Sequence, residues 1–127
     1  MEPLARLTAA DLLSLAAQAA SPCVDCEVLS CAGWESIHGG ADLSRLDNVG
    51  TLRDPALEDP TVEEHHPAGT RCGSADAPIA PAWFPYNRCD VWRCSRCGSG
   101  FLRYTEYGGY YSDERIRALN PALVTGA

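Results

Sequence analysis

The sequence predicts a small α+β protein, in which an N-terminal helix and a short C-terminal helix flank an antiparallel β core. Residues 8–20 are rich in alanine and leucine, with apolar side chains at helical spacing. Nine of the ten aromatic residues lie between Trp83 and Tyr111, in segments with the composition of strands. At 127 residues the chain has the length of one domain, so residues 1–127 are interpreted as a single domain.

The N-terminal helix is expected within residues 1–21. Thr8 can cap its start, and Asp11, three residues later, completes the pattern of a capping box. Pro22 follows the helical stretch, and proline cannot continue a helix. The first cysteine pair therefore lies in a turn directly after the helix.

Residues 39–82 are expected to form an acidic insertion rich in loops. The stretch is dense in Gly, Pro, Asp and Glu, and Asp-Pro occurs at 54–55 and again at 59–60. These residue types favour turns over regular structure. Around it the sequence favours only two short elements, a strand over 27–34 and a helix over 41–46.

Residues 83–119 are expected to form the aromatic-rich core, which includes the second cysteine pair. Its expected elements are strands over 91–93 and 101–107, a hairpin turn at Gly108-Gly109, a return strand from 110, and a helix over 113–119 capped by Ser112.

The charge is uneven along the chain. The formal net charge is −7, and all ten basic residues are arginines. Residues 1–87 carry four arginines against thirteen acids, a net of −9, whereas residues 88–127 carry six against four, a net of +2. The protein as a whole is thus a poor general binder of nucleic acid, although its C-terminal third remains a candidate contact surface. The sequence has no apolar run of the length that spans a membrane and no basic leader, which favours a cytoplasmic location.

Seven cysteines favour metal binding over disulfides, because the number is odd and two pairs have Cys-x-x-Cys spacing. The pairs are Cys23/Cys26 and Cys94/Cys97. Each pair can bind one ion from a single tight turn, and two such turns complete a tetrahedral four-thiolate zinc site. Gly98 directly after the second pair permits the backbone bend that such a turn needs.

In these residues the chain resembles the zinc-ribbon superfamily, in which two cysteine knuckles, each leading into a β-hairpin, hold one zinc ion. The resemblance is one of motif and covers about residues 22–34 and 89–111. It implies Zn²⁺ as a structural cofactor and a closed site without catalysis. The chain departs from the pattern because 67 residues separate the two pairs.

Other ligand sets remain open at the level of sequence. The cysteines at 23, 26 and 31 mirror the spacing of those at 89, 94 and 97. Two separate sites, each completed by a histidine, are therefore an alternative to one site. A further alternative is that the additional cysteines are buried thiols that behave as small apolar groups. The residues in question are Cys31, Cys72, Cys89, His38, His65 and His66.

Three further motifs are compatible with other kinds of chemistry. Residues 63–66, Glu-Glu-His-His, resemble a metal or acid–base site but lack the second half of any known motif, and a solvated polar run is the simpler interpretation. A zinc deaminase is excluded because no histidine precedes residue 38. Cys94 and Cys97 between arginines could act as a redox dithiol, but a β-hairpin replaces the βαβ context of such motifs.

The leading hypothesis is a non-catalytic, zinc-stabilised protein-interaction module with a protein partner. Its contact face is expected at residues 101–117, because tyrosine and arginine dominate the hot spots of interfaces. The acidic segment 42–66 could instead contact a basic partner. One alternative is a nucleic-acid-associated zinc ribbon that uses the Tyr/Arg-rich C-terminal hairpin, which includes Arg103 and Tyr104. The other is a thiol redox protein that uses Cys94 and Cys97.

Overall fold

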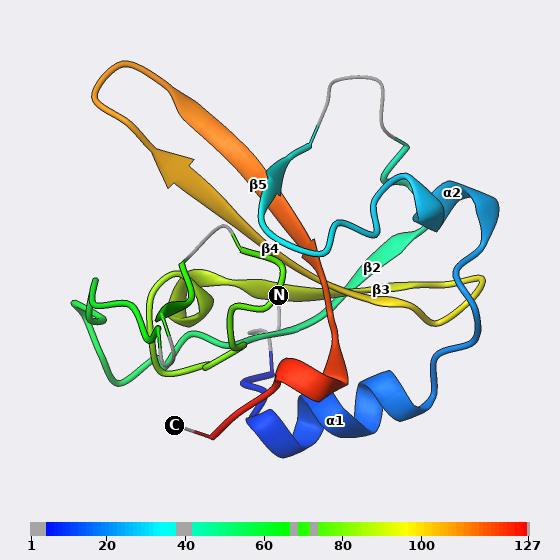
Figure 1. Cartoon of the computed structure of the whole chain (residues 1–127), viewed down its shortest axis with the longest axis horizontal. Helices are drawn as coiled ribbons and strands as arrows, with labels where there is room; N and C mark the ends of the chain where they lie inside the picture. The colour runs from blue at the N-terminus through cyan, green and yellow to red at the C-terminus, as the bar shows by residue number, and fades with distance from the viewer. Residues whose placement is uncertain (1–4, 38–41, 67–68, 72–73, 127) are drawn as a thin grey trace.

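The protein is built around one antiparallel sheet (Figure 1). The computed structural model describes residues 5–37, 42–66, 69–71 and 74–126. The sheet has five strands in the order β1-β5-β4-β3-β2, and each neighbouring pair is antiparallel. The elements are α1 (Ala9–Ala17), α2 (Val24–Glu27), β1 (Glu35–Ser36), β2 (Leu46–Thr51), the 3₁₀ turn η2 (Tyr86–Arg88), β3 (Asp90–Cys94), β4 (Gly100–Tyr107), β5 (Ser112–Ala118) and the 3₁₀ turn η3 (Pro121–Leu123). The predicted α+β class is confirmed.

The helix α1 begins where its sequence predicts. The Thr8 hydroxyl accepts a hydrogen bond from the Asp11 backbone N–H, and the Asp11 carboxylate accepts one from the Thr8 N–H, which is the expected capping box. The helix ends at Ala17, a few residues before the predicted end, and Leu12 is its fully buried residue. Among the described residues, no helix is long and apolar enough to cross a membrane.

The hairpin of β4 and β5 contains the longest pairing in the sheet. Its register runs from Phe101 opposite Ala118 to Tyr107 opposite Ser112, and its tip projects away from the rest of the molecule in Figure 1. At the tip, the Gly108 N–H donates a hydrogen bond of 2.8 Å to the Tyr111 carbonyl. The turn predicted at Gly108-Gly109 is confirmed, with the return strand beginning at Ser112 rather than at 110.

Three predicted elements differ from the structure. The helix expected over 113–119 is wrong, because Ser112–Ala118 is the strand β5, and pairing with β4 along its whole length outweighs local helix propensity. The strand expected over 27–34 is also wrong: the helix α2 and turns occupy the stretch up to β1 at Glu35. Of the helix expected over 41–46, residue 41 lies outside the described residues, and the rest is a turn that leads into β2 at Leu46.

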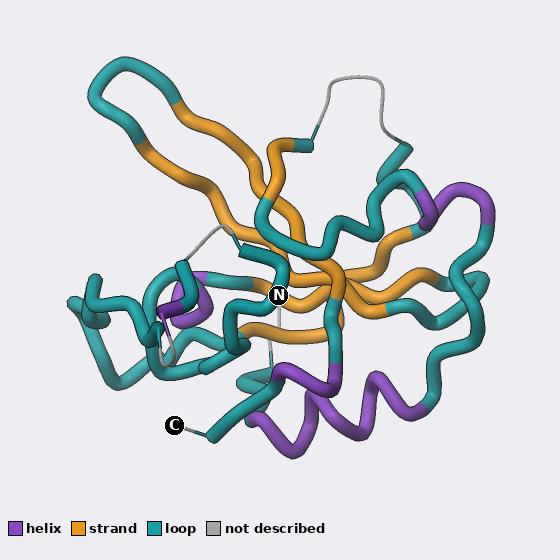
Figure 2. Tube along the Cα trace, viewed as in Figure 1, coloured by secondary structure: helices purple, strands orange, loops and turns teal. Residues whose placement is uncertain are grey.

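The described part of residues 39–82 lies largely in loops, as Figure 2 shows, but it also contributes β2 to the sheet. The strand β2 pairs with β3, so that Leu46 lies opposite Cys94 and Thr51 opposite Asp90. This pairing passes beside the second cysteine pair. The acidic segment is thus anchored to the site by a strand that the sequence did not reveal.

Side chains pack on both faces of the sheet. Adjacent residues of a strand point to opposite faces, and both Phe101 and Leu102 are fully buried. Leu102 belongs to a cluster that includes Leu12 of α1, whereas Phe101 belongs to a second cluster that includes Cys26 and Cys94. The helix therefore covers one side of the core, and the cysteine pairs form part of the other.

Arg117 on β5 is fully buried, and no carboxylate among the described residues forms an ion pair with it. Its Nε donates to the Ala32 carbonyl at 3.1 Å, and its terminal nitrogens donate to the carbonyls of Ala75 and Ala77 and to the Tyr86 hydroxyl. One side chain thus connects the strand to three loop segments. Buried carbonyls without donors are costly, so these loops depend on the guanidinium.

We predict that Arg117→Met lowers the free energy of unfolding by about 3 kcal/mol, because the buried Ala77 carbonyl and Tyr86 hydroxyl lose their donor at once. Denaturant unfolding measures this. Arg71→Met at an exposed position is the matched control and should change stability by less than about 0.5 kcal/mol. Equal stability of the two variants would contradict the role assigned to Arg117.

Candidate metal centre

The first cysteine pair lies on a single short turn of helix. Cys23 is the N-cap of α2, and its carbonyl accepts hydrogen bonds of 3.0 Å from the N–H groups of both Cys26 and Glu27. This turn places Cys23 and Cys26 on the same side of the chain. The knuckle is itself a helical turn and is followed by further turns, not by the β-hairpin that the zinc-ribbon resemblance implies.

The second pair lies in the turn between β3 and β4, as expected for a zinc knuckle. The Gly98 N–H donates to the Cys94 carbonyl at 3.0 Å, and the Arg96 N–H donates to the Cys94 Sγ at 3.4 Å. Gly98 has a φ of 77°, a conformation that glycine adopts without steric cost. The sequence-based interpretation of Gly98 is therefore confirmed.

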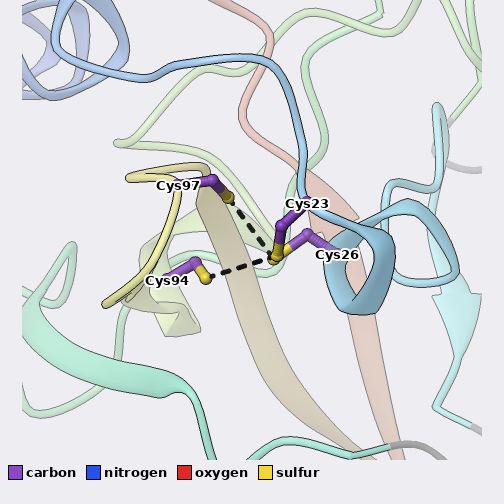
Figure 3. A group of neighbouring side chains, drawn as sticks. All are labelled: Cys23, Cys26, Cys94 and Cys97. Carbon is purple, nitrogen blue, oxygen red and sulfur yellow. Dashed lines mark hydrogen bonds between the residues drawn. The ribbon is translucent and has the colours of Figure 1, made fainter.

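The structure brings all four predicted ligands together, as Figure 3 shows. The four Sγ atoms lie within 4.8 Å of one another. The Cys23 and Cys94 Sγ atoms are 3.9 Å apart, and the Cys26 and Cys97 Sγ atoms are 3.7 Å apart. Four sulfurs at about 2.3 Å from a central ion have mutual distances of about 3.8 Å. The donor set therefore fits one tetrahedrally bound ion.

The backbone holds the two knuckles against each other. The Ala20 N–H, just before the first knuckle, donates to the Cys97 carbonyl at 2.9 Å. The Ser95 N–H in the second knuckle donates to the Arg45 carbonyl at 2.8 Å, next to the start of β2. The site is therefore placed by hydrogen bonds that do not involve the sulfur atoms.

The thiols of the site are free and differ in acidity. Their Sγ separations far exceed the length of about 2.05 Å of a disulfide. Burial and the neighbouring thiols raise the pKa of Cys26. Burial also acts to raise the pKa of Cys97, but hydrogen bonds from Ser99 and from the Cys23 backbone outweigh it and lower that pKa to about 6. Without a cation, four thiolates this close would repel one another.

Charged side chains around the site balance four thiolates and a divalent ion. The Arg45 Nε lies 2.7 Å from the Asp25 carboxylate, and an Arg96 nitrogen lies 3.9 Å from it. An Arg93 nitrogen approaches the backbone of Gly98. Three guanidinium groups, one carboxylate, four thiolates and one divalent ion sum to zero charge. The sequence pointed to Arg93 and Arg96, whereas Arg45 and Asp25 carried no recognisable signal.

The remaining candidate ligands take no part in this cluster. Cys31 packs beside it, and burial and Glu35 raise its pKa to about 11. Cys89 is fully buried in the other cluster. His65 stacks on Trp83, and His66 lies 2.9 Å from Glu64, so the run at 63–66 holds no metal cluster among the described residues. Cys72 and His38 lie outside the described residues.

Comparison with protein-family models, with curated proteins and with solved structures finds no match to the chain. The interpretation of the site therefore rests on the chain's own geometry. That geometry provides four sulfur donors at the spacing of one metal ion.

We predict one bound metal ion per chain, lost in Cys97→Ser because three thiolates cannot complete the tetrahedron. Elemental analysis of protein purified without chelator measures this. Cys31→Ala removes a thiol that packs beside the site without joining it and should keep the ion. If Cys97→Ser still contains one zinc ion per chain, Cys97 is excluded as a ligand.

We also predict that Gly98→Ala destabilises the protein by about 1 to 2 kcal/mol, because alanine is strained at positive φ. Its Cβ would also lie 3.2 Å from an Arg93 nitrogen. Gly109→Ala is the matched control, since nothing lies within 4 Å of its Cβ and its φ is not in the left-handed region. Denaturant unfolding of both variants should show a lower free energy of unfolding for Gly98→Ala alone.

Proposed function

We propose that the four cysteines hold one structural Zn²⁺ and that the chain is a non-catalytic protein-interaction module of the cytoplasm. The observation that carries the proposal is the approach of two Cys-x-x-Cys pairs to within 4.8 Å, although Cys23 and Cys94 are 71 residues apart. Four thiolates fill a tetrahedral site, and closed sites are structural rather than catalytic. The six described cysteines are free thiols, in keeping with a reducing compartment.

Zinc supports the fold energetically in this proposal. Closing a loop of this length costs about 4 kcal/mol of chain entropy. Structural zinc in small domains contributes about 10 to 16 kcal/mol. The free energy of zinc binding therefore exceeds the entropy cost of bringing the two knuckles together. Thiolate sets also bind iron and Cu(I), so elemental analysis has to measure zinc, iron and copper together.

The accessible part of the expected contact face is the tip of the β4–β5 hairpin. Tyr107, Tyr110 and Tyr111 are 81%, 105% and 60% exposed. The arginines of that face are engaged within the fold. Arg117 is buried, Arg115 lies 3.1 Å from the Glu106 carboxylate, and the Arg103 guanidinium lies 4.3 Å from the centre of the Trp92 ring. Exposed tyrosines without free arginines favour a protein partner over nucleic acid.

One observation favours the redox alternative. Cys97 is partly exposed, and its pKa of about 6 makes it a thiolate at neutral pH, the form that attacks disulfides. Cys94, its partner in such a pair, is fully buried. The two proposals differ in a measurable way, because zinc would occupy both sulfurs and block their exchange with a disulfide reagent.

We predict that removal of zinc by a chelator unfolds the β core, because the energy of metal binding is folding energy. Near-ultraviolet circular dichroism follows the loss, since Trp34 and Trp92 lie in the two packed clusters. Restoring one equivalent of zinc should restore the signal. A metal-free chain that stays folded and reduces a disulfide substrate would support the redox function instead.

A further inference from the structure

A cleft of about 630 Å³ lies between the acidic segment and the outer half of β4, from Tyr104 to Tyr107. Its apolar and aromatic lining residues are Leu57, Val62, Phe84, Tyr104 and Tyr107. The volume falls in the range of sites that hold ligands or inserted side chains. Leu57 and Val62 are 55% and 71% exposed, and such apolar side chains around a cleft are typical of a contact site.

The carboxylates of the cleft outnumber its cations. Asp54, Glu58 and Glu106 line it together with Arg53 and Arg88. Among the described residues, Glu58 has neither an ion pair nor a side-chain hydrogen bond and is exposed. The surrounding segment adds the exposed acids at 59, 63 and 64. The cleft therefore favours a positively charged occupant.

The two arginines of the cleft are occupied in holding its walls. The Arg53 Nε donates to the Arg88 carbonyl at 3.2 Å. The Arg88 guanidinium donates to the Pro60 carbonyl at 2.8 Å and lies 5.9 Å from the centre of the Phe84 ring. These contacts connect the acidic segment to the turn η2. They give both cations a structural role. Of the three carboxylates that line the cleft, Asp54 is paired with Arg6 and Glu106 with Arg115, which leaves Glu58 available to a partner among the described residues.

An unpaired acceptor also lies at the cleft. Asn87 is 5% exposed, and its amide nitrogen donates to the carbonyls of Thr61 and Ala82, which fixes the orientation of the amide. Its Oδ1 is buried and has no donor among the described residues. The Nε of Arg88 lacks an acceptor as well, but its guanidinium is already compensated by Pro60 and Phe84. Asn87 therefore connects the acidic segment to the turn η2, as Arg88 does.

We propose that this cleft docks a basic segment of a partner protein, with an arginine or lysine side chain inserted between its aromatic and carboxylate walls. The aliphatic stem of such a side chain suits Leu57 and Val62, and its charged end suits Tyr107 and Glu58. The inference rests on the proposed interaction function and identifies its surface and the chemistry of its partner. It assigns Tyr107, at the edge of the exposed tip, to the cleft.

The test uses the full-length, zinc-loaded protein and two fluorescent peptides, one of alternating arginine and leucine and one of alternating glutamate and leucine. Fluorescence anisotropy at physiological salt should show saturable binding of the basic peptide alone. The double variant Glu58→Gln/Tyr107→Ala should weaken that binding on the order of tenfold, because it removes one ion pair and one cation–π contact.

The matched control is Asp76→Asn/Leu13→Ala, which removes one exposed carboxylate and one exposed apolar side chain outside both the cleft and the hairpin tip. It should change affinity by less than about twofold if the contact is local rather than a response to net charge. An equal loss in both double variants would overturn the cleft as the docking site, as would binding of the acidic peptide or the absence of binding. Zinc content is measured in the same samples. Loss of peptide binding with zinc retained concerns the cleft alone, whereas absence of zinc concerns the zinc proposal.

Discussion

The approach of two cysteine pairs from distant parts of the chain is the constraint on which the rest of the structure depends. Cys26 and Cys94 are fully buried and belong to the same packed cluster as Phe101 and Ile116. The site is thus part of the core on one face of the sheet. A small domain buries little apolar surface, so a metal ion in that position contributes stability that side chains alone do not supply.

The same constraint positions the surfaces that can meet a partner. The second knuckle is the turn between β3 and β4, and β4 continues into the exposed hairpin tip. The strand β2 pairs with β3 and joins the acidic segment to the sheet. The cleft forms where that segment returns to β4. The second knuckle therefore joins the two strands next to which both surfaces lie.

The sequence allowed the four ligands to be predicted because Cys-x-x-Cys spacing is a local signal. The capping box of α1 and the turn at Gly108-Gly109 are local in the same sense, and both are confirmed. The return strand was predicted, but a helix was placed over 113–119, because the extent of the strand is set by pairing with β4 rather than by residues within it. Arg117 was expected on the contact face for the same reason, since its burial depends on loops 40 and more residues away.

The central claim is that one zinc ion is bound by four sulfurs. X-ray absorption at the zinc edge of the purified protein tests it most directly, because the method counts the ligands and measures their distances. The account predicts four sulfur neighbours at about 2.3 Å and no nitrogen or oxygen neighbour. A shell containing histidine nitrogen, or fewer than four sulfurs, would contradict the assignment of Cys23, Cys26, Cys94 and Cys97 as the complete site.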